Sequence, residues 1–595
     1  MKNERGSSLI LVMLVSLLFV TLGLTILSVS IEGTKRTTVR ENDVVTSQDA
    51  ILEMSKILSD FHNKVKDVSI KNKINLKSGV YQSNLQQILN SLPTNLSNRY
   101  TDSSKTKPVL TVTDETSNFL NDLAYKTNYY TRVYLFKLDY YGKLYSNTPE
   151  LKKSISRRVY LSPTPSFLQY TVGAKDLLSL NGASNITGNV YGNDVSILNQ
   201  ANYVDAKTPT NSESNAESPY PTITGSLVVQ HQIQLWSRLK NLPEHKYNSE
   251  EIPLISQTNF ANYFYQKFPP IIKKPDEEFV NMDFKQTLYD KLNLAVSPIQ
   301  VDSNLPLDQT LGDTIVNSIF KSNKIEKKQE NVSLLNSNST IQQYIIDKLT
   351  NPGDIANEIP PSKKVIVMTD LSDPKTQEQN SAPFIIKDNI HLQKDQWLIV
   401  NGNLEIYNDH HSSNAPLDIQ GNIIVLGNVT IHGFNHDTTS EHDEIKFDST
   451  MYVTGDSSIY STNITGLNEK HLVLLSKGNL LVNRTNEFTT LKDNALPLKA
   501  YLYTDSSATF YGVGSAISIN GGVFANHSLT INAIRQNTVQ TSDPNILIIQ
   551  PEVFQNTQSS RFTVTYDKSI LLSQLEGLPT VDSLRMIVDH YTFSK

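Results

Sequence analysis

The sequence predicts a mainly β fold that begins with a long α-helix. Three features indicate it: an uncharged apolar run at the N-terminus, an amphipathic pattern directly after it, and short alternating apolar stretches joined by Gly or Asn further along. The expected architecture is a transmembrane helix, a small α+β module and a right-handed parallel β-helix, or solenoid. This solenoid is expected to carry an inserted, partly helical block.

The N-terminal apolar run extends from Ser7 to Ile31, which is 25 residues without a charge. About 20 such residues span a bilayer as a helix. The preceding leader "MKNERG" contains Lys2 and Arg5, and basic residues favour the cytoplasmic side of a membrane. We therefore expect a single-pass cell-membrane protein, with the bulk of the chain outside the cell.

The pattern after Ile31 becomes that of a helix with one apolar face. Apolar residues recur every seven positions in two adjacent rows, which are Val44, Ile51, Leu58 and Val65, and Met54, Phe61 and Val68. Such a face packs against a globular domain or against neighbouring copies of the same helix. The sequence leaves both alternatives open.

Composition excludes several classes of function. The 53 basic and 59 acidic residues give a net charge of -6, so the strongly basic domain of a nucleic-acid-binding protein is absent from the sequence. The chain contains no cysteine, which excludes disulfides, thiolate metal sites and cysteine nucleophiles.

The stretch "RGSSLILVMLVSLLFVTLGLTIL" resembles the N-terminal segment of PilX-type minor-pilin-like proteins of type IV pilus and related secretion systems. The resemblance implies that a prepilin peptidase cleaves after Gly6 and leaves Ser7 as the mature N-terminus. An uncleaved signal anchor is the alternative. Most major pilins have Glu where this chain has Leu11, and they often have a helix-breaking proline that is absent here. This departure puts polymerisation along a shaft in doubt.

A Tyr-rich stretch, "NYYTRVYLFKLDYYGKLYS", alternates in the manner of a β-hairpin. The following "KKSISRRVYLSPTPSFLQYTVGAKDLLSLNGASNITGNVYG" is similar to a passage of the same family, in which a strand, a Pro-containing linker and Asn-Gly steps succeed one another. We expect a pilin-like module to end there and a repetitive region to begin.

Short apolar cores preceded by a Gly step recur in the C-terminal half and predict solenoid coils. Gly402, Gly421, Gly455, Gly478 and Gly521 are separated by 19, 34, 23 and 43 residues, which indicates coils of about 20 residues with one insertion and one doubled interval. Gly and Asn suit the corners because they accept left-handed backbone. A β-sandwich of short antiparallel strands is the alternative.

The block between the early and late coils contains "HQIQLWSRL" and "TIQQYIIDKL", which predict helices, and "KFPPIIKKP", which predicts extended structure. The whole chain then divides as follows: leader 1–6, transmembrane helix 7–31, amphipathic stalk helix 32–68, pilin-like module 69–175, first solenoid coils 176–230, inserted block 231–362, main solenoid 363–555 and C-terminal segment 556–595.

Enzymes built on parallel β-helices need carboxylates clustered on one face of adjacent coils. No such cluster is evident at the coil spacing, and Asp418, Asp456 and Asp505 have the sequence context of turn residues. Phosphate-loop, dinucleotide and nucleophile-elbow motifs are absent from the sequence. We expect no catalytic residue, no cofactor and no enzyme activity.

Six of the twelve histidines lie between His391 and His442. Side chains of His432, His436, Glu441, His442 and Asp443 are of the types that bind zinc, but their spacing matches no established motif. An exposed polar loop explains them as well, and we predict no metal site.

Three functions remain after these exclusions. The first is a structural or adhesion component, with the membrane, pilin or pseudopilin subunits and a prepilin peptidase as partners, an extracellular glycan or protein as a further candidate ligand, and no nucleic acid. The second is a surface-tethered carbohydrate-active β-helix enzyme. The third is a scaffold whose solenoids stack end to end, which an uncapped solenoid end would favour.

Overall fold

The computed structural model divides the chain into two compact units: unit 1 is Met1–Pro163 with Asp582–Lys595, and unit 2 is Thr164–Val581. The structure describes residues 4–66, 80–100, 106–119, 131–142, 151–162, 165–204, 213–237, 244–252, 260–275, 279, 281–295, 301–307, 311, 314, 332–336, 365–369, 383–387, 389–392, 397–408, 416–433, 444–485, 497–540, 547–549, 560–567, 569–570, 577–579, 581, 584–589 and 591–594.

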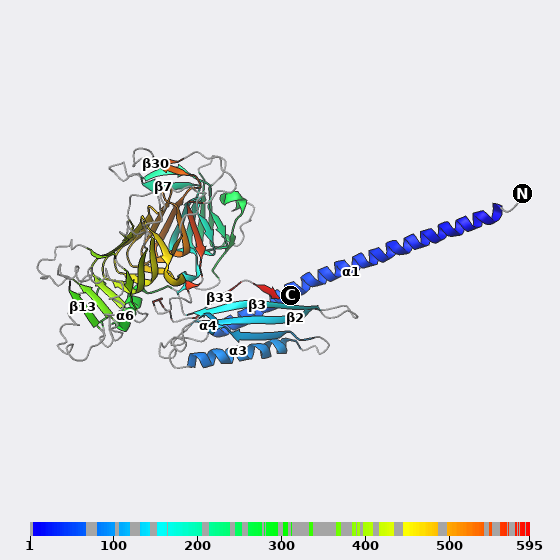
Figure 1. The fold of residues 1–595 in the computed structure, drawn as a ribbon, viewed down its shortest axis with the longest axis horizontal. Helices are drawn as coiled ribbons and strands as arrows, with labels where there is room; N and C mark the ends of the chain where they lie inside the picture. Colours follow the sequence, from blue (N-terminus) through cyan, green and yellow to red (C-terminus); the bar gives the residue numbers. More distant parts are fainter. Residues whose placement is uncertain are drawn as a thin grey trace. The chain divides into compact units, whose positions relative to one another are not determined.

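Unit 1 consists of a long helix, a second helix and an antiparallel sheet (Figure 1). The sheet has the order β1-β2-β3-β33, with β34 also paired to β3. As the hairpin pattern predicts, β2 and β3 pair antiparallel. The elements are α1 (Glu4–Lys66), α3 (Val80–Arg99), β1 (Val109–Asp114), α4 (Thr116–Phe119), β2 (Arg132–Gly142), β3 (Leu151–Ser162), β33 (Arg585–Val588) and β34 (Thr592–Ser594).

The core of unit 1 forms between the C-terminal third of α1, α3 and one face of the sheet. Four residues of the predicted apolar stripe are buried in it: Met54, Leu58, Phe61 and Val65. The ring of Phe61 lies 5.2 Å from that of Phe136 on β2. Val44 is 54% exposed and Ile51 is half-buried, while Val68 lies outside the described residues.

The last strands of the chain complete this sheet. Val588 pairs with Val159 on β3, and Met586 and Val588 pack against the core beside buried Leu584. Tyr591 joins the strands to the helix, because its hydroxyl lies 2.8 Å from Ser55 Oγ. The predicted C-terminal segment 556–595 is thus divided between the two units, and unit 2 is an insertion between β3 and β33.

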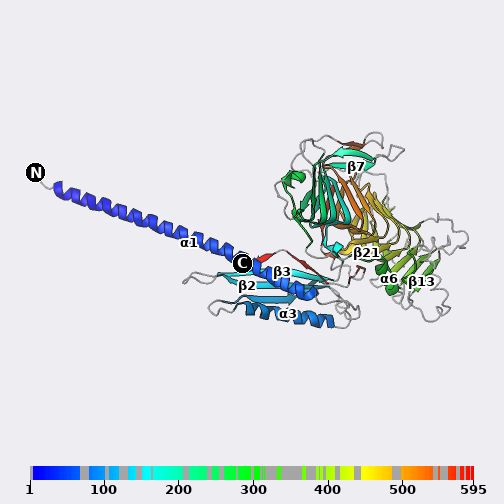
Figure 2. The ribbon, with the colours of Figure 1, turned by 180° about the vertical axis from the view of Figure 1, so that it is seen from behind.

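Unit 2 is built from stacked parallel strands, which we call the column (Figure 2). Its strands fall into three parallel ladders, called A, B and C, that share one apolar core. This arrangement is consistent with a β-helix, and the parallel pairing excludes an antiparallel sandwich for these strands.

Each ladder follows its own set of strands. Ladder A contains β14 (Val365–Thr369), β17 (Trp397–Asn401), the second halves of β19 (Leu417–Val425) and β21 (Glu444–Val453), β24 (Leu472–Ser476), β26 (Leu498–Thr504), the second half of β28 (Ile517–Ala525), and the first halves of β4 (Val172–Gly182), β6 (Val190–Leu198) and β10 (Ser226–Trp236). Ladder B contains β15 (Phe384–Ile386), β18 (Leu404–Tyr407), β20 (Val429–His432), β22 (Ser457–Tyr460), β25 (Leu480–Asn483), β27 (Ala508–Gly512), β29 (Ser528–Ala533), and the second halves of β4, β6 and β10. Ladder C contains β16 (Ile390–His391), the first halves of β19 and β21, β23 (Asn463–Gly466), the start of β26, the first half of β28, β32 (Phe562–Tyr566), β5 (Asn185–Thr187) and β9 (Thr222–Thr224).

Ladder A is buried on both of its faces. Phe167 of the short helix η2 (Ser166–Gln169) stacks 4.4 Å from the outward ring of Tyr503. Helix α6 (Phe284–Ala295) brings Phe284 to 6.4 Å from the outward ring of Tyr452. Strands buried on both faces read as continuous apolar runs, which explains "WLIV", "LVLL" and "YLY" in ladder A.

The corners between ladders A and B are stacked Gly-Asn or Gly-Asp steps. Gly402, Gly427, Gly455 and Gly478 succeed one another at intervals of 25, 28 and 23 residues. A Cβ atom on Gly427 would lie 2.4 Å from the carbonyl oxygen of Gly402, so a side chain has no room there. The predicted coil length of about 20 residues is therefore too short for this part of the column.

Two of the glycines on which that prediction depended lie at a different corner. Gly421 and Gly521 bend β19 and β28 from ladder C into ladder A, with φ of 127° and 146°. Only glycine adopts these values without strain. Intervals measured across two kinds of corner do not give the coil length.

The chain enters and leaves the column in the same coil. Residues 172–174 of β4 pair with 523–525 of β28, and residues 177–182 pair with 528–533 of β29. Strand β32 supplies ladder C of that coil, because it pairs with β28 on one side and with β5 on the other. The coils formed by β4, β6 and β10 therefore stack onto the coil formed by β28 and β29, although they come earlier in the sequence.

This topology changes the role of the predicted inserted block 231–362. Strand β10 lies at one end of the column and β13 (Val332–Asn336), which pairs with β14, lies at the other. Residues 237–331 therefore connect the two ends and do not interrupt successive coils. The block contains α6, β11 (His245–Asn248) and β12 (Ile271–Lys273).

One predicted helix of this block is wrong. The stretch 231–236 is the second half of β10, with Ile233 and Leu235 buried and the alternate Gln232 and Gln234 half-buried. This period of two is that of a strand. The second predicted helix, 340–349, lies outside the described residues.

The β10 end of the column is capped. Ile252, Phe260, Tyr263 and Phe264 belong to the same buried core as the strands. In ladder B, strand β11 pairs antiparallel with the second half of β10 and ends the parallel pairing. In ladder A, β12 pairs parallel with the first half of β10 and is the last strand among the described residues.

Candidate functional site

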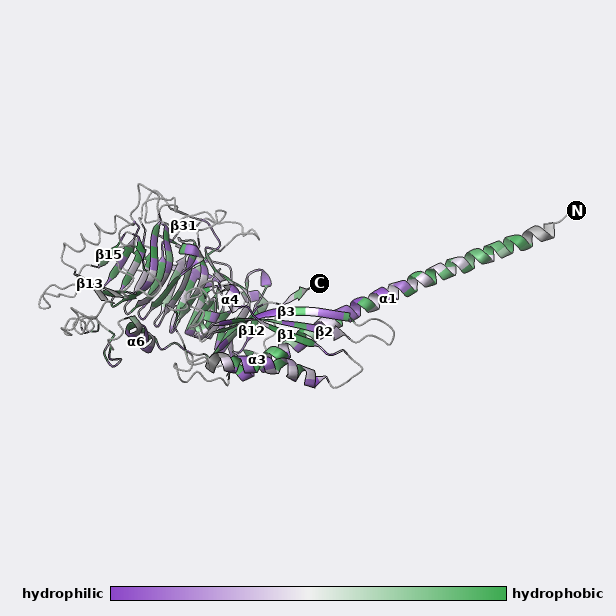
Figure 3. Ribbon diagram, turned by 60° about the horizontal axis from the view of Figure 1, so that its bottom comes forward, coloured by the Kyte–Doolittle hydropathy of each residue, from purple (hydrophilic) through white to green (hydrophobic). Residues whose placement is uncertain are grey.

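The N-terminal part of α1 is the largest apolar surface without a partner in the described chain. Every large apolar side chain from Leu9 to Ile31 is exposed, for example Phe19 at 68% and Leu17 at 65%. Figure 3 shows this part of α1 as an almost unbroken hydrophobic rod. Among the described residues, α1 alone is long and apolar enough to cross a membrane.

Two of the polar side chains in this segment bond to the helix itself. Thr21 donates its hydroxyl to the carbonyl oxygen of Leu18 at 2.9 Å, and Thr25 donates to that of Thr21 at 2.6 Å. A group satisfied within its own helix needs no partner from water. The segment therefore suits surroundings that offer no hydrogen bonds.

Charge returns directly after the apolar segment. Arg36 forms an ion pair with Glu32 at 2.6 Å, and both side chains are mostly exposed. Contact with the sheet begins at Asp43, which pairs with Lys153 on β3 at 2.6 Å, so the mostly exposed residues 32–42 separate the apolar segment from the packed part.

The predicted processing residues Gly6 and Ser7 fall in the first turns of α1. Their side chains lie outside the described part of the structure. Cleavage between them stays a prediction.

The three aspartates that we expected to be turn residues lie on different parts of the column. Asp456 accepts a hydrogen bond from the backbone N–H of Asn479 at 2.7 Å, within the Gly-Asn corner. Asp505 accepts from Asn526 Nδ2 at 3.0 Å, and burial raises the pKa of its carboxyl group. Asp418 lies within β19 on ladder C.

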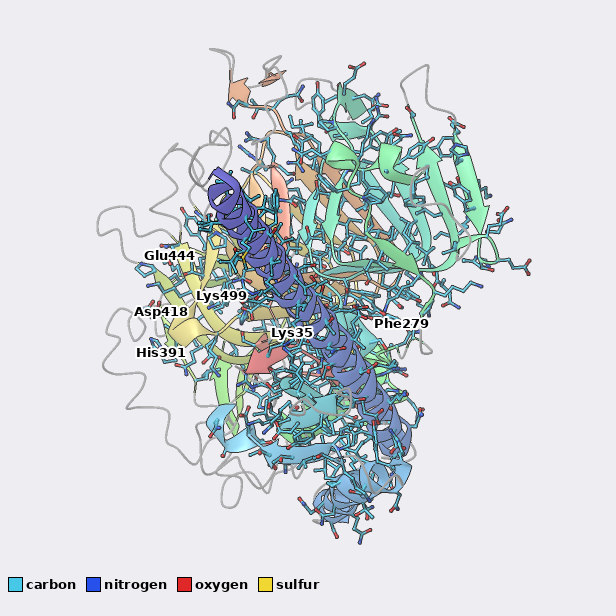
Figure 4. The ribbon with its side chains drawn as sticks, turned by 90° about the vertical axis from the view of Figure 1, so that its right-hand side faces the viewer. Lys35, Phe279, His391, Asp418, Glu444 and Lys499 are labelled. Atoms are coloured by element: carbon cyan, nitrogen blue, oxygen red, sulfur yellow. The ribbon has the colours of Figure 1, made fainter. Side chains whose placement is uncertain are left out.

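Ladder C carries a group of charged side chains that the sequence analysis missed. Asp418 lies opposite Lys446, and Gln420 lies opposite Asp448 on the next strand. Figure 4 places His391, Asp418 and Glu444 along the outer side of neighbouring strands. Residues that lie opposite each other on ladder C, such as His391 and Gln420 or Asp418 and Lys446, are 29 and 28 positions apart in the sequence, so only the true coil length brings them together.

The predicted histidine cluster is only partly described. His436, Glu441, His442 and Asp443 lie outside the described residues, whereas His432 closes β20. Within the described ranges, no group of three or more His, Asp or Glu side chains could hold a metal ion.

Comparison with known proteins adds a weak likeness to a solved structure. No protein-family model matches the chain, and no curated protein matches it. Among solved structures, the competence-associated pilin ComZ from Thermus thermophilus aligns with 87% of this chain and 96% of its own length, at 11% identity and a TM-score of 0.24. This TM-score is too low to indicate a shared fold, so function has to be inferred from the chain's own residues.

Proposed function

We propose that this chain is a membrane-anchored, pilin-like structural or adhesion component of a type IV pilus or related secretion apparatus. In this proposal the column is a right-handed β-solenoid, displayed at the cell surface and without catalytic activity. Its partners are the membrane, pilin or pseudopilin subunits and a prepilin peptidase.

The observation that carries the proposal is the division of α1. One continuous helix has an apolar N-terminal part that is exposed on all sides and a C-terminal part that packs on an antiparallel sheet. A helix that is apolar all round requires a bilayer or other helices around it. The packed part holds the sheet, and with it the column that is inserted between β3 and β33.

Two further observations bear on the alternatives. The capped β10 end disfavours a scaffold that stacks through this end. The charged row on ladder C is the feature that favours a carbohydrate-active enzyme, because Asp418 and Asp448 lie on neighbouring strands, two register positions apart, and such enzymes use a pair of carboxyl groups. Turnover of a polysaccharide that is lost in Asp418→Asn would replace the adhesive proposal.

The experiment that tests the proposal is mass spectrometry of the mature N-terminus, in a host that has a prepilin peptidase. The expected chain begins at a methylated Ser7. Gly6→Leu should abolish processing, whereas the control Gly23→Leu should leave it unchanged, because the space around Gly23 is open. A wild-type chain that still begins at Met1 would contradict the pilin-like part of the proposal.

A further inference from the structure

His432 lies on the outer side of ladder B between two tyrosine rings. Its ring centroid is 4.6 Å from that of Tyr407 on the preceding coil, with an interplanar angle of 29°. On the following coil it is 4.9 Å from the ring of Tyr460, at 10°. The three residues are in register on β18, β20 and β22.

Both nitrogens of the His432 ring face hydrogen-bond acceptors. Nε2 lies 2.6 Å from Oε1 of Glu405, and Nδ1 lies 3.1 Å from the carbonyl oxygen of Gly433. A neutral imidazole has one N–H, whereas the imidazolium has two. A neutral ring beside an ionised Glu405 therefore cannot make both hydrogen bonds, whereas the imidazolium can.

Two features of the surroundings interact with a positive charge on the ring. The faces of tyrosine rings attract cations. The His432 side chain is only 13% exposed and that of Glu405 28%, so water screens their interaction less than it would at an open surface.

We propose that His432, with Glu405, Tyr407 and Tyr460, forms a proton-dependent staple across three coils. The staple fixes the corner at Gly433, where the backbone N–H of Gly433 donates to Ser461 at 3.1 Å. On the other side, the N–H of Asn408 donates to the carbonyl oxygen of His432 at 3.3 Å.

The equivalent corners on the next two coils are strained. Ser461 and Arg484, which follow β22 and β25, have φ of 50° and 53°, in the left-handed region that side chains other than Gly rarely adopt. The backbone N–H of Ser461 donates to the carbonyl oxygen of Arg484 at 3.1 Å. Loss of the hydrogen bond between His432 and the carbonyl oxygen of Gly433 therefore affects neighbouring corners whose backbone conformation is already unfavourable.

The direction of the pH effect follows from the charge. Among the described residues, the charged or titratable groups facing this site are Glu405 and Tyr407 from β18, Tyr460 from β22 and Arg484 beyond β25. Burial, with a further contribution from Glu405, raises the pKa of Tyr460, so its hydroxyl stays neutral. The imidazolium has the extra N–H and therefore the extra contact, so the staple is closed at the lower pH and opens as the pH rises.

Hydrogen exchange on the full chain in detergent, with a chelator present, tests the staple. After correction for intrinsic rates, the amides of residues 429–433 should be about tenfold or more better protected at pH 5.5 than at pH 8, because a hydrogen bond to a charged group is lost. The amides of β24 serve as the internal reference and should show no such difference.

Three variants make the test specific. Glu405→Gln should abolish the difference, because an amide can donate to the neutral ring, and His432→Gln should abolish it as well. His527→Gln should retain it, because His527 pairs with Asp176 elsewhere on the column and its side chain is 62% exposed. A wild-type difference below twofold, or a difference that persists in Glu405→Gln, would overturn the proposal.

Discussion

The two ends of α1 belong to one helix but differ in what surrounds them. From Leu9 to Ile31 the side chains are apolar and exposed, and among the described residues none packs against another element. From Thr46 to Val65 one face is buried against α3 and the sheet, while the other carries exposed Asp49, Lys56 and Asn63.

This difference shows that apolar residues have two different structural roles within one helix. In the packed part, an apolar face with a period of about 3.6 residues matches a core within the same chain. In the exposed part, apolar residues cover every face, so the matching surface has to come from a membrane or another chain. The first two predictions below each change one part of α1 and leave the other intact, and the next two change residues outside both parts.

The largest effect is expected in the packed part. Phe61 is fully buried beside Phe136 and Tyr134, so Phe61→Ala should destabilise unit 1 by about 3–5 kcal/mol. Phe19→Ala, an identical change in the exposed part, should alter the free energy of unfolding by less than about 0.5 kcal/mol. Chemical denaturation in detergent measures both, and equal effects would contradict the division of α1.

A charge in the exposed part should change location and leave stability unchanged. Leu18→Arg adds about 2.5–3.5 kcal/mol to the cost of inserting the helix at its centre. We expect the variant to be lost from the membrane fraction while its unfolding transition stays the same. Full retention in the membrane fraction would argue that the segment does not lie in the bilayer.

Acid should affect the column and leave anchoring unchanged, because no titratable side chain lies between Ser7 and Ile31. In unit 2, the His471 ring hydrogen-bonds Asp567 at 3.0 Å and holds the pKa of that carboxyl group well below its usual range. A lowered pKa stabilises the fold above the unfolded value of about 3.9, and the contribution disappears as pH falls through the folded value.

Thermal unfolding of Asp567→Asn checks this effect. The wild type should unfold at a higher temperature than the variant at pH 6, and the gap should narrow steadily towards pH 3. A difference in unfolding temperature that stays constant from pH 6 to pH 3 would show that the charge of Asp567 does not contribute to stability.

The smallest effect is expected for a substitution in the segment between the two parts of α1. The Arg36–Glu32 pair is exposed at both ends, with 77% and 64% of the side chains accessible. Exposed helix pairs contribute about 0.3–0.5 kcal/mol, so Arg36→Ala should change neither stability nor membrane retention measurably. A marked loss of either would mean that this segment has a partner outside the described chain.

The sequence predicts those parts of the fold that depend on local pattern. The apolar run, the stripe through Phe61 and the β2–β3 hairpin are each encoded within a few turns or strands. The closure between β4 and β29 joins residues about 350 positions apart, and no periodicity reveals it. The strand at 231–236 was predicted as a helix, because a short apolar run fits both a strand and a helix.

The same limit applies to the surface of the column. His432 attracts notice in the sequence as one of many histidines, but its partner Glu405 is 27 residues away. Spacing of this kind becomes informative only when the coil length is known, and insertions vary that length from coil to coil. The row formed by Asp418 and Lys446 was missed for the same reason.

The central claim is that the exposed part of α1 lies in a membrane with the rest of the chain outside. The chain has no cysteine, so single-cysteine variants report one position each. In cells with an intact cytoplasmic membrane, a membrane-impermeant maleimide should label Val39→Cys and Leu481→Cys, whereas Ser16→Cys should react only after solubilisation. Labelling of Ser16→Cys in intact cells, or protection of Val39→Cys and Leu481→Cys, would contradict the account.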